Sequence, residues 1–217
     1  MKPFLVESVG FILRTLNRLS PLEYLLLAAK GRTKQTIGAL TELWVVSNFL
    51  VALLLLVVLP ASPQTVLRWA VIGYSAIRIL EIVSFQAFTQ LYGGYRNKSP
   101  RLHYLLLSYR RSIFLAVLLY LEITAWFATL YRLNSTAFSV TGVSLTDSAK
   151  ALYFSTITMT TVGYGDVHAE CGPAFLLVTC QALIAVFMTL LIFARIVSYL
   201  PRPSTADPLE QETQNPD

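Results

Sequence analysis

The chain contains the segment Thr160-Thr161-Val162-Gly163-Tyr164-Gly165-Asp166, around which its helices are expected to be arranged. It is a short polar and glycine-rich run between two strongly apolar segments. Backbone that is neither helix nor strand cannot face lipid, because its N–H and C=O groups would be unsatisfied; protein or water must surround it. Gly163 and Gly165 permit backbone angles that a side chain disfavours. Alternating with Val162 and Tyr164, they can turn successive carbonyls toward a common axis.

The segment just before this stretch is expected to be a short helix. Asp147 and Ser148 provide a helix start, and an apolar pattern follows to Thr158. About 11 residues cannot cross a bilayer, which requires about 20, so the segment must enter the membrane and turn back. A helix carboxyl end carries partial negative charge, and this one would meet Thr160. The alternative is that Gly-Tyr-Gly is only a turn between two helices.

Composition places the chain among integral membrane proteins. Of its 217 residues, 55% are hydrophobic and 13% are charged, whereas soluble domains have about 45–50% apolar and about 25% charged residues. The apolar runs are continuous, which favours helices over a β-barrel. Cys171 and Cys180 are too few for a disulfide framework and lack metal-site spacing. No nucleophile–base pair supports an enzyme. The expected class is an all-α membrane protein.

Four membrane-spanning helices are expected in addition to the re-entrant segment. Three basic residues between Lys30 and Lys34, and five between Gly93 and Arg111 without an acid, predict that these segments are cytoplasmic. Both termini are then inside, and the re-entrant loop enters from outside. The expected spans are residues 37–59, 64–91, 112–132 and 173–200.

We divide the chain into four parts. Residues 1–35 are expected to form an amphipathic cytoplasmic or interfacial segment, which either couples to a gate or only anchors the chain. Residues 36–111 contain two spans and a basic loop, and residues 112–200 contain the other two spans with the re-entrant stretch. Residues 201–217, rich in proline and acids, are predicted to be a disordered cytoplasmic tail.

Charged residues inside the spans are unusual. Arg78 and Glu81 are three apart on the second span, so they share a helix face, and Glu122 interrupts the third span. Such groups mark a packed or watery interior. They form either a voltage-sensing or ion-coupled network, or a structural ion pair that Glu122 joins. The repeated arginines of a voltage sensor are absent. Four basic residues either attract anionic lipid head groups or only fix topology: Lys98, Arg101, Arg110 and Arg111.

Residues 148–198 resemble the pore domain of potassium channels, especially prokaryotic ones. The resemblance is carried by the core Ala151–Asp166, which reads ALYFSTITMTTVGYGD. With the third span as the outer helix, it extends over residues 112–200. The two preceding spans match no family that we can name.

The resemblance implies a homotetramer in which each subunit contributes one filter strand around a fourfold axis. The carbonyls of Thr161, Val162, Gly163 and Tyr164, with the Thr161 hydroxyl, would bind K⁺ at stacked sites in place of its hydration shell. Gly165 would shape the outer mouth. Filter support would come from three further residues: Tyr153, Thr160 and Asp166. The expected partners are K⁺, the bilayer and further copies of the chain, with no other cofactor and no nucleic acid.

Some positions depart from the family pattern. Tyr153 and Phe154 stand where relatives often have two tryptophans, and Tyr153 is expected to hydrogen-bond Asp166. Ile157 stands where some relatives have a glutamate. His168 at the outer mouth either confers pH sensitivity or is merely solvated.

The inner helix also departs from the family pattern. Ala185 occupies the place of the hinge glycine, and no glycine or proline lies between Ala174 and Leu200, so a large kink has no evident cause. The gate is therefore expected in the filter or in small helix rotations. Four residues at helical spacing would line the cavity, although some could instead face lipid or a neighbour: Val186, Thr189, Phe193 and Val197. Phe193 and Val197 could form a hydrophobic constriction.

The predicted function is passive, potassium-selective conduction in the plasma (cell inner) membrane. Three alternatives remain. A nonselective cation pore is disfavoured by the intact Thr161–Gly165 motif. A transporter or potassium-uptake component is disfavoured because the chain shows no internal repeat. A non-conducting or regulatory channel subunit stays open.

Overall fold

Apolar stretches of this length fold as helices because a helix satisfies its own backbone hydrogen bonds in lipid. The computed structural model describes residues 4–18, 20–22, 24, 33–91, 109–140 and 145–198. The long helices are α3 (Lys34–Val58), α4 (Thr65–Leu91), α5 (Tyr109–Leu133) and α7 (Gly172–Ser198). The shorter elements are α1 (Phe4–Arg18), η2 (Ser135–Ala137), β1 (Phe138–Val140), α6 (Ser148–Met159) and β2 (Val167–Ala169).

Three of the described helices are long and apolar enough to cross a membrane: α3, α5 and α7. The predicted second span also forms a helix, α4, whose 27 residues extend roughly 40 Å. Its length exceeds the thickness of a bilayer core, but Arg78, Glu81 and other polar residues lower its mean hydropathy. The prediction of helices over these four ranges and over the short re-entrant segment is confirmed.

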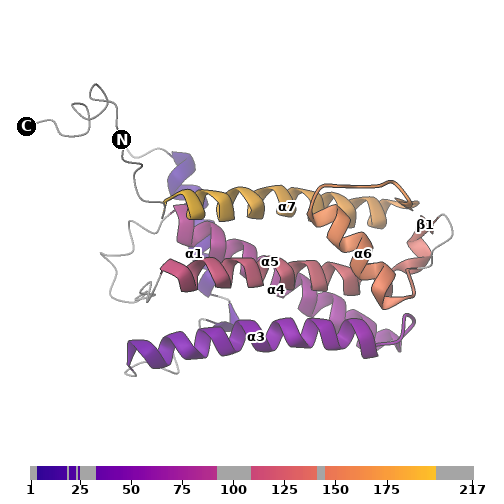
Figure 1. Cartoon of the computed structure of the whole chain (residues 1–217), viewed down its shortest axis with the longest axis horizontal. Helices are drawn as coiled ribbons and strands as arrows, with labels where there is room; N and C mark the ends of the chain where they lie inside the picture. The colour runs from indigo at the N-terminus through magenta and orange to yellow at the C-terminus, as the bar shows by residue number, and fades with distance from the viewer. Residues whose placement is uncertain are drawn as a thin grey trace, which may run out of the picture.

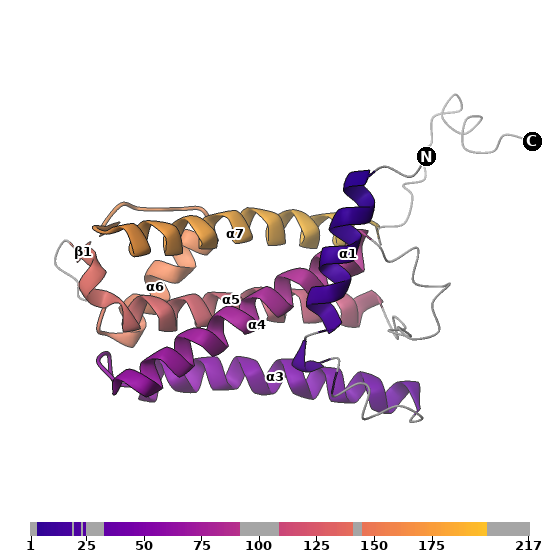
Figure 2. The same ribbon diagram turned by 180° about the vertical axis from the view of Figure 1, so that it is seen from behind.

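The long helices lie lengthwise and α5 is the central one. Figures 1 and 2 show α3 along one side, α7 along the opposite side and α5 between them. The short helix α6 lies between α5 and α7 at one end of the molecule, beside β1, and α1 crosses α4 at the other end. We refer to these as the α6 end and the α1 end.

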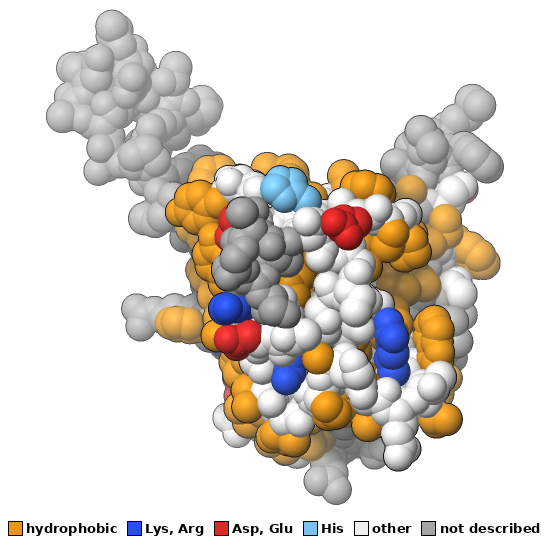
Figure 3. Space-filling model, turned by 90° about the vertical axis from the view of Figure 1, so that its right-hand side faces the viewer, with side chains coloured by type: hydrophobic (Ala, Val, Ile, Leu, Met, Phe, Trp, Pro, Cys, Tyr) orange, Lys and Arg blue, Asp and Glu red, His pale blue; other side chains and the backbone are white. Residues whose placement is uncertain are grey.

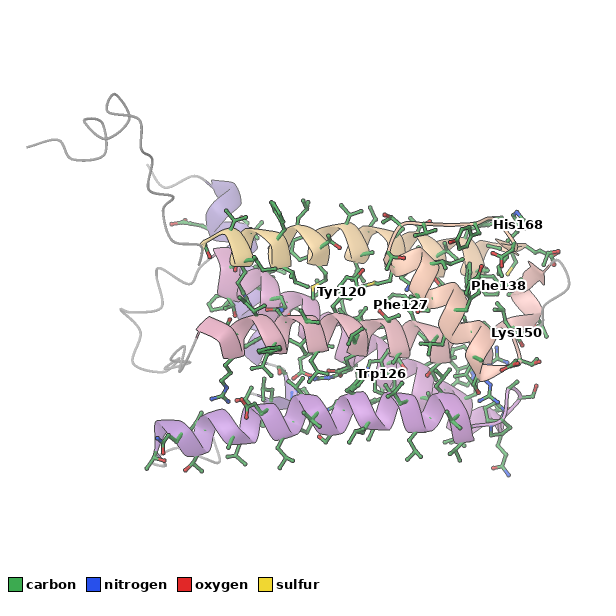
Figure 4. The ribbon with its side chains drawn as sticks, in the orientation of Figure 1. Tyr120, Trp126, Phe127, Phe138, Lys150 and His168 are labelled. Atoms are coloured by element: carbon green, nitrogen blue, oxygen red, sulfur yellow. The ribbon has the colours of Figure 1, made fainter. Side chains whose placement is uncertain are left out.

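The core is built around the second half of α5, where every side chain from Glu122 to Tyr131 is buried. Tyr131 packs against Phe154 of α6, with ring centroids 4.7 Å apart, and edge-on against Phe138 of β1 at 5.4 Å. Figure 4 shows Trp126 on the α3 side of α5, whereas Tyr120 and Phe127 lie toward α7 and α6. α5 therefore packs against α3, α4, α6 and α7, and its second half forms the centre of the described core.

A two-stranded sheet at the α6 end departs from the all-α prediction. β1 and β2 pair antiparallel, with Phe138 opposite Ala169 and Ser139 opposite His168. The Glu170 N–H donates to the Ala137 carbonyl at 3.0 Å, which extends the ladder. Three-residue strands are too short to show an alternating pattern, and their pairing joins segments that are distant in sequence, so the sequence gives no signal for them.

The amphipathic prediction for the first residues corresponds to α1, which contacts α4. Gly10 of α1 is buried, whereas Phe11 and Ile12 are exposed. Farther along, the Ser20 hydroxyl accepts a hydrogen bond from the Leu22 N–H at 3.2 Å, as expected for a helix start. The predicted tail, residues 201–217, lies outside the described residues.

The amino-terminal cap of α6 can be tested directly. The Asp147 carboxylate accepts a hydrogen bond from the Ala149 N–H at 2.9 Å. Asp147→Ala is expected to lower the free energy of unfolding by about 1 kcal/mol, because that N–H loses its partner. Asp147→Asn, which caps as well, should cost only a few tenths of a kcal/mol. Denaturant unfolding in detergent measures both, and equal losses for the two variants would contradict a capping role.

Candidate functional site

The backbone of the glycine-rich stretch alternates between two kinds of conformation. Thr161, Gly163 and Gly165 have positive φ values of 60°, 51° and 76°, whereas Val162 and Tyr164 between them do not. In a strand, successive peptide groups point to opposite sides. Alternating left-handed and ordinary residues instead turns successive carbonyls toward the same side. The conformation therefore suits a row of carbonyl oxygens facing one axis.

The amides of the stretch point back to α6. The N–H groups of Val162 and Gly163 both donate to the Ile157 carbonyl, at 2.9 and 3.2 Å. The Thr161 N–H donates to the Thr158 carbonyl at 3.1 Å. Among the described residues, no hydrogen bond reaches a carbonyl of residues 161–165. The donors are thus partly satisfied inside the chain, and the acceptors are left for something outside it.

One side of the stretch is uncovered in a single chain. Val162 is 51% exposed and Tyr164 is 70% exposed. A Cβ added to Gly163 or Gly165 would meet no atom within 4 Å, so these glycines serve backbone conformation and not close packing. One row of carbonyls cannot surround an ion, and the exposed face is where further rows would have to stand.

Tyr153 lies beside the glycine-rich stretch. Its ring stacks on Tyr164, with centroids 6.4 Å apart and planes 7° from parallel. The Asp166 carboxylate interacts with it electrostatically, and Asp166 Oδ1 is buried without a hydrogen-bond partner among the described residues. A direct Tyr153–Asp166 hydrogen bond remains a prediction.

Four polar side chains that the sequence analysis did not single out fix α6. Tyr120 donates from its hydroxyl to the Met159 carbonyl at 2.7 Å, and Ser155 donates to the Thr124 carbonyl at 2.7 Å. Gln181 Nε2 donates to the Ser155 carbonyl at 2.9 Å, and its Oε1 accepts from the Tyr131 hydroxyl at 2.5 Å. Polar groups in apolar spans are costly unless they have hydrogen-bond partners. Polar residues inside the apolar segments were therefore the sequence signal that could have identified these contacts.

The predicted cavity residues of α7 and the predicted hinge position, Ala185, differ in their exposure. Thr189 and Val197 are exposed together with Val186, and Phe193 is 65% exposed. Ala185 has no exposed surface and lies in the core of the chain. Ala185, which stands at the predicted hinge position, therefore faces the other helices of its own chain, whereas the four predicted cavity residues are exposed in a single chain.

His168 lies at the α6 end on β2, exposed and opposite Ser139. Figure 3 views this end of the molecule: backbone and polar surface occupy its middle, with the histidine near the upper edge. Figure 4 likewise places His168 at the rim, away from the core aromatics. This placement matches a solvated histidine, and no described contact links it to the filter.

Arg78, Glu81 and Glu122, the charged residues singled out in the sequence, form one cluster. Arg78 pairs with Glu81 of its own helix, Nη1 to Oε2, at 2.5 Å, and with both carboxylate oxygens of Glu122 on α5, at 2.6 and 3.0 Å. All three side chains are buried, and Trp126 Nε1 donates to Glu122 at 3.2 Å. The guanidinium also lies 5.7 Å from the ring centre of Trp44 on α3. The cluster joins α3, α4 and α5.

This cluster also holds the segment that precedes α3. The Ser20 hydroxyl and the Leu22 N–H, the latter at 3.0 Å, both donate to Glu81 Oε1. A cavity of about 30 Å³, enough for one or two waters, borders Arg78 and Glu81. Arg195 of α7 borders it too, and donates to Gln86 Oε1 of α4 at 3.2 Å. Arg195, which was not predicted from the sequence to have a role, links α7 to α4 by this hydrogen bond.

The residues predicted to attract anionic lipid are mostly not described. Lys98 and Arg101 lie outside the described residues, as does the side chain of Arg110. Arg111 forms an ion pair with Glu42 of α3, Nε to Oε1, at 2.5 Å. Its charge is therefore partly compensated by the chain itself.

Arg78 is expected to be the most costly of these charges to remove. Arg78→Ala leaves two buried carboxylates without their cation, and such losses cost about 3–5 kcal/mol. Arg68→Ala is the control, because the side chain of this half-buried arginine of the same helix makes one hydrogen bond to the described residues, to Asn134; its loss should cost about 1 kcal/mol. Unfolding in detergent measures both, and similar losses would show that the cluster contributes little.

Comparison with protein families gives a match in the carboxyl-terminal part of the chain. Residues 115–202 match a family model described as ion channel, which covers most of α5 and all of α6, the glycine-rich stretch and α7. No curated protein and no solved structure gives a significant match. The mostly helical chain, with three candidate membrane spans, thus carries an ion channel domain in its carboxyl-terminal part.

Proposed function

We propose that the protein is a potassium-selective channel that conducts K⁺ passively down its electrochemical gradient. One observation carries the proposal: residues 161–165 alternate in φ, are exposed, and have carbonyls that accept no hydrogen bond from the described part of the chain. Rings of backbone carbonyls can replace the hydration shell of K⁺. The Val162 and Gly163 amides bond to α6, which aims the acceptors away from the protein.

The proposed active form is a homotetramer. A single chain supplies one carbonyl row, and four rows around an axis would make rings at Thr161, Val162, Gly163 and Tyr164, with the Thr161 hydroxyl at the inner end. Support comes from the exposure of this face and from α6, whose carboxyl end at Thr160 would add partial negative charge below the rings. Val186, Thr189, Phe193 and Val197 would line the cavity below.

We further propose four membrane spans, with α4 as the additional one. Its charges are buried against α5 and Ser20 rather than facing lipid, which removes the main objection to its crossing the bilayer. The basic segments 30–34 and 93–111 favour cytoplasmic termini, and the plasma membrane fits such an orientation. α1, with exposed Phe11 and Ile12, would lie on the inner membrane surface.

The experiment is K⁺ flux from liposomes that contain the purified protein. Gly163→Ala and Gly165→Ala are expected to abolish flux, because each forces a side chain into a left-handed conformation that costs about 1–2 kcal/mol in every subunit. Gly73→Ala is the matched control: this glycine of α4 also has open space around it, and its φ is not positive, so flux should be unchanged.

Wild-type protein that passes Na⁺ as readily as K⁺ would contradict the proposed selectivity. Flux that is absent from the pure protein but restored by another channel subunit would favour a regulatory role instead. Accumulation against a gradient would indicate a transporter component.

A second prediction concerns filter rigidity. Tyr153→Phe keeps the stack on Tyr164 but removes the hydroxyl that faces Asp166. Current through the variant in planar bilayers should decline faster after activation than wild-type current, because a hydrogen bond behind the filter is lost. Tyr153→Leu, which also removes the stack, should decline faster still. Kinetics identical to wild type in both variants would exclude Tyr153 from filter support.

A further inference from the structure

Arg132, at the last turn of α5, contacts two segments that are far apart in sequence. Its Nη1 donates to the carbonyl of Leu56 at 2.6 Å and to that of Leu59, both at the end of α3. Its Nε donates to the Thr146 carbonyl at 2.8 Å, just before α6 begins. One guanidinium therefore joins the end of α3 to the start of α6.

The chemistry suits an arginine at this place. The last four carbonyls of a helix have no partner within it and carry partial negative charge. A planar guanidinium presents several donors in a fixed geometry, whereas an ammonium is a point charge. Arg132 also lies in the last turn of its own helix, so its charge is favourable at two helix ends.

Leu56 is the common contact point of α3, α5 and α6. Its carbonyl also accepts a hydrogen bond from the Ser148 hydroxyl at 2.8 Å, at the first residue of α6. Its side chain is buried in a small cluster with Ala128 of α5 and Ala151 of α6. Both the backbone and the side chain of α3 therefore help to fix the beginning of α6.

The position of α6 in turn fixes the proposed filter. The Ile157 carbonyl of α6 holds the amides of Val162 and Gly163. A shift of the start of α6 would move Ile157, since a short helix moves as a rigid body. Selectivity between ions requires the carbonyls to hold a defined number and spacing around the ion, so the α3 contact bears on selectivity.

We propose that Arg132 is a positioning residue for ion selectivity: with Ser148, it ties the last turn of α3 to α6 and so holds the filter in its selective conformation. This inference rests on the proposed potassium selectivity. In this proposal α3, which lies outside the ion channel domain, stabilises the position of α6 and thereby the conformation of the filter.

The test is the ratio of Na⁺ to K⁺ flux in liposomes. Arg132→Gln removes the charge and most of the donors, and it is expected to raise the ratio several-fold. Ser148→Ala removes only the second link to Leu56 and should raise it less. Arg132→Lys keeps the positive charge but loses the planar set of donors, and it should give an intermediate ratio. Arg68→Gln is the matched control, because Arg68 bonds Asn134 and makes no described contact with α6; its ratio should equal that of wild type.

The outcomes separate the two proposals. Wild-type protein without K⁺ preference overturns the potassium selectivity. Selective wild-type protein with unchanged ratios in Arg132→Gln and Ser148→Ala overturns the positioning role. A loss of thermal stability in Arg132→Gln with an unchanged ratio shows a merely structural contact, which also overturns it. If Arg132→Gln does not fold, Ser148→Ala decides: a raised ratio supports the inference, and a wild-type ratio contradicts it.

Discussion

The backbone of the glycine-rich stretch after α6 belongs to no helix or strand, and its N–H and C=O groups still need hydrogen-bond partners. The amides of Thr161, Val162 and Gly163 find acceptors in the last turns of α6, and the carbonyls of residues 161–165 accept no hydrogen bond from any described residue. Because α6 supplies these acceptors, the position of the stretch depends on the position of α6. Tyr120, Gln181 and Ser155 fix it by hydrogen bonds to α5 and α7, in surroundings where no water competes for those groups.

The charged residues of the apolar helices serve cohesion between the amino-terminal helices and the ion channel domain. Arg78 with Glu122 joins α4 to α5, Arg195 with Gln86 joins α7 to α4, and Arg132 joins α3 to the start of α6. Between helices in lipid there is little hydrophobic driving force for association. Directional polar contacts can therefore specify which helix faces pair, which apolar packing alone cannot do. This accounts for the presence of charged side chains despite the cost of burying them.

The helices were predictable because their signals are local. Continuous apolar runs, the cap at Asp147 and the short length of the segment after it predict the four long helices and α6 to within a few residues. The pairing of β1 with β2, the Tyr131–Gln181 hydrogen bond and the burial of Ala185 were not predictable. Each depends on which helix faces join, and helical periodicity alone does not choose between faces that are equally apolar.

The glycine-rich stretch, its short preceding helix and the resemblance to a potassium-channel pore can all be read from residue types, because these dictate which backbone angles and which lipid contacts are tolerable. The surroundings of the stretch became visible only in the folded chain. The tertiary structure brought Arg78, Glu81 and Glu122 into one buried cluster and set Arg132 between α3 and α6. Side chains on separate helices meet only when packing fixes the rotation of each helix, and that rotation depends on all the helices together.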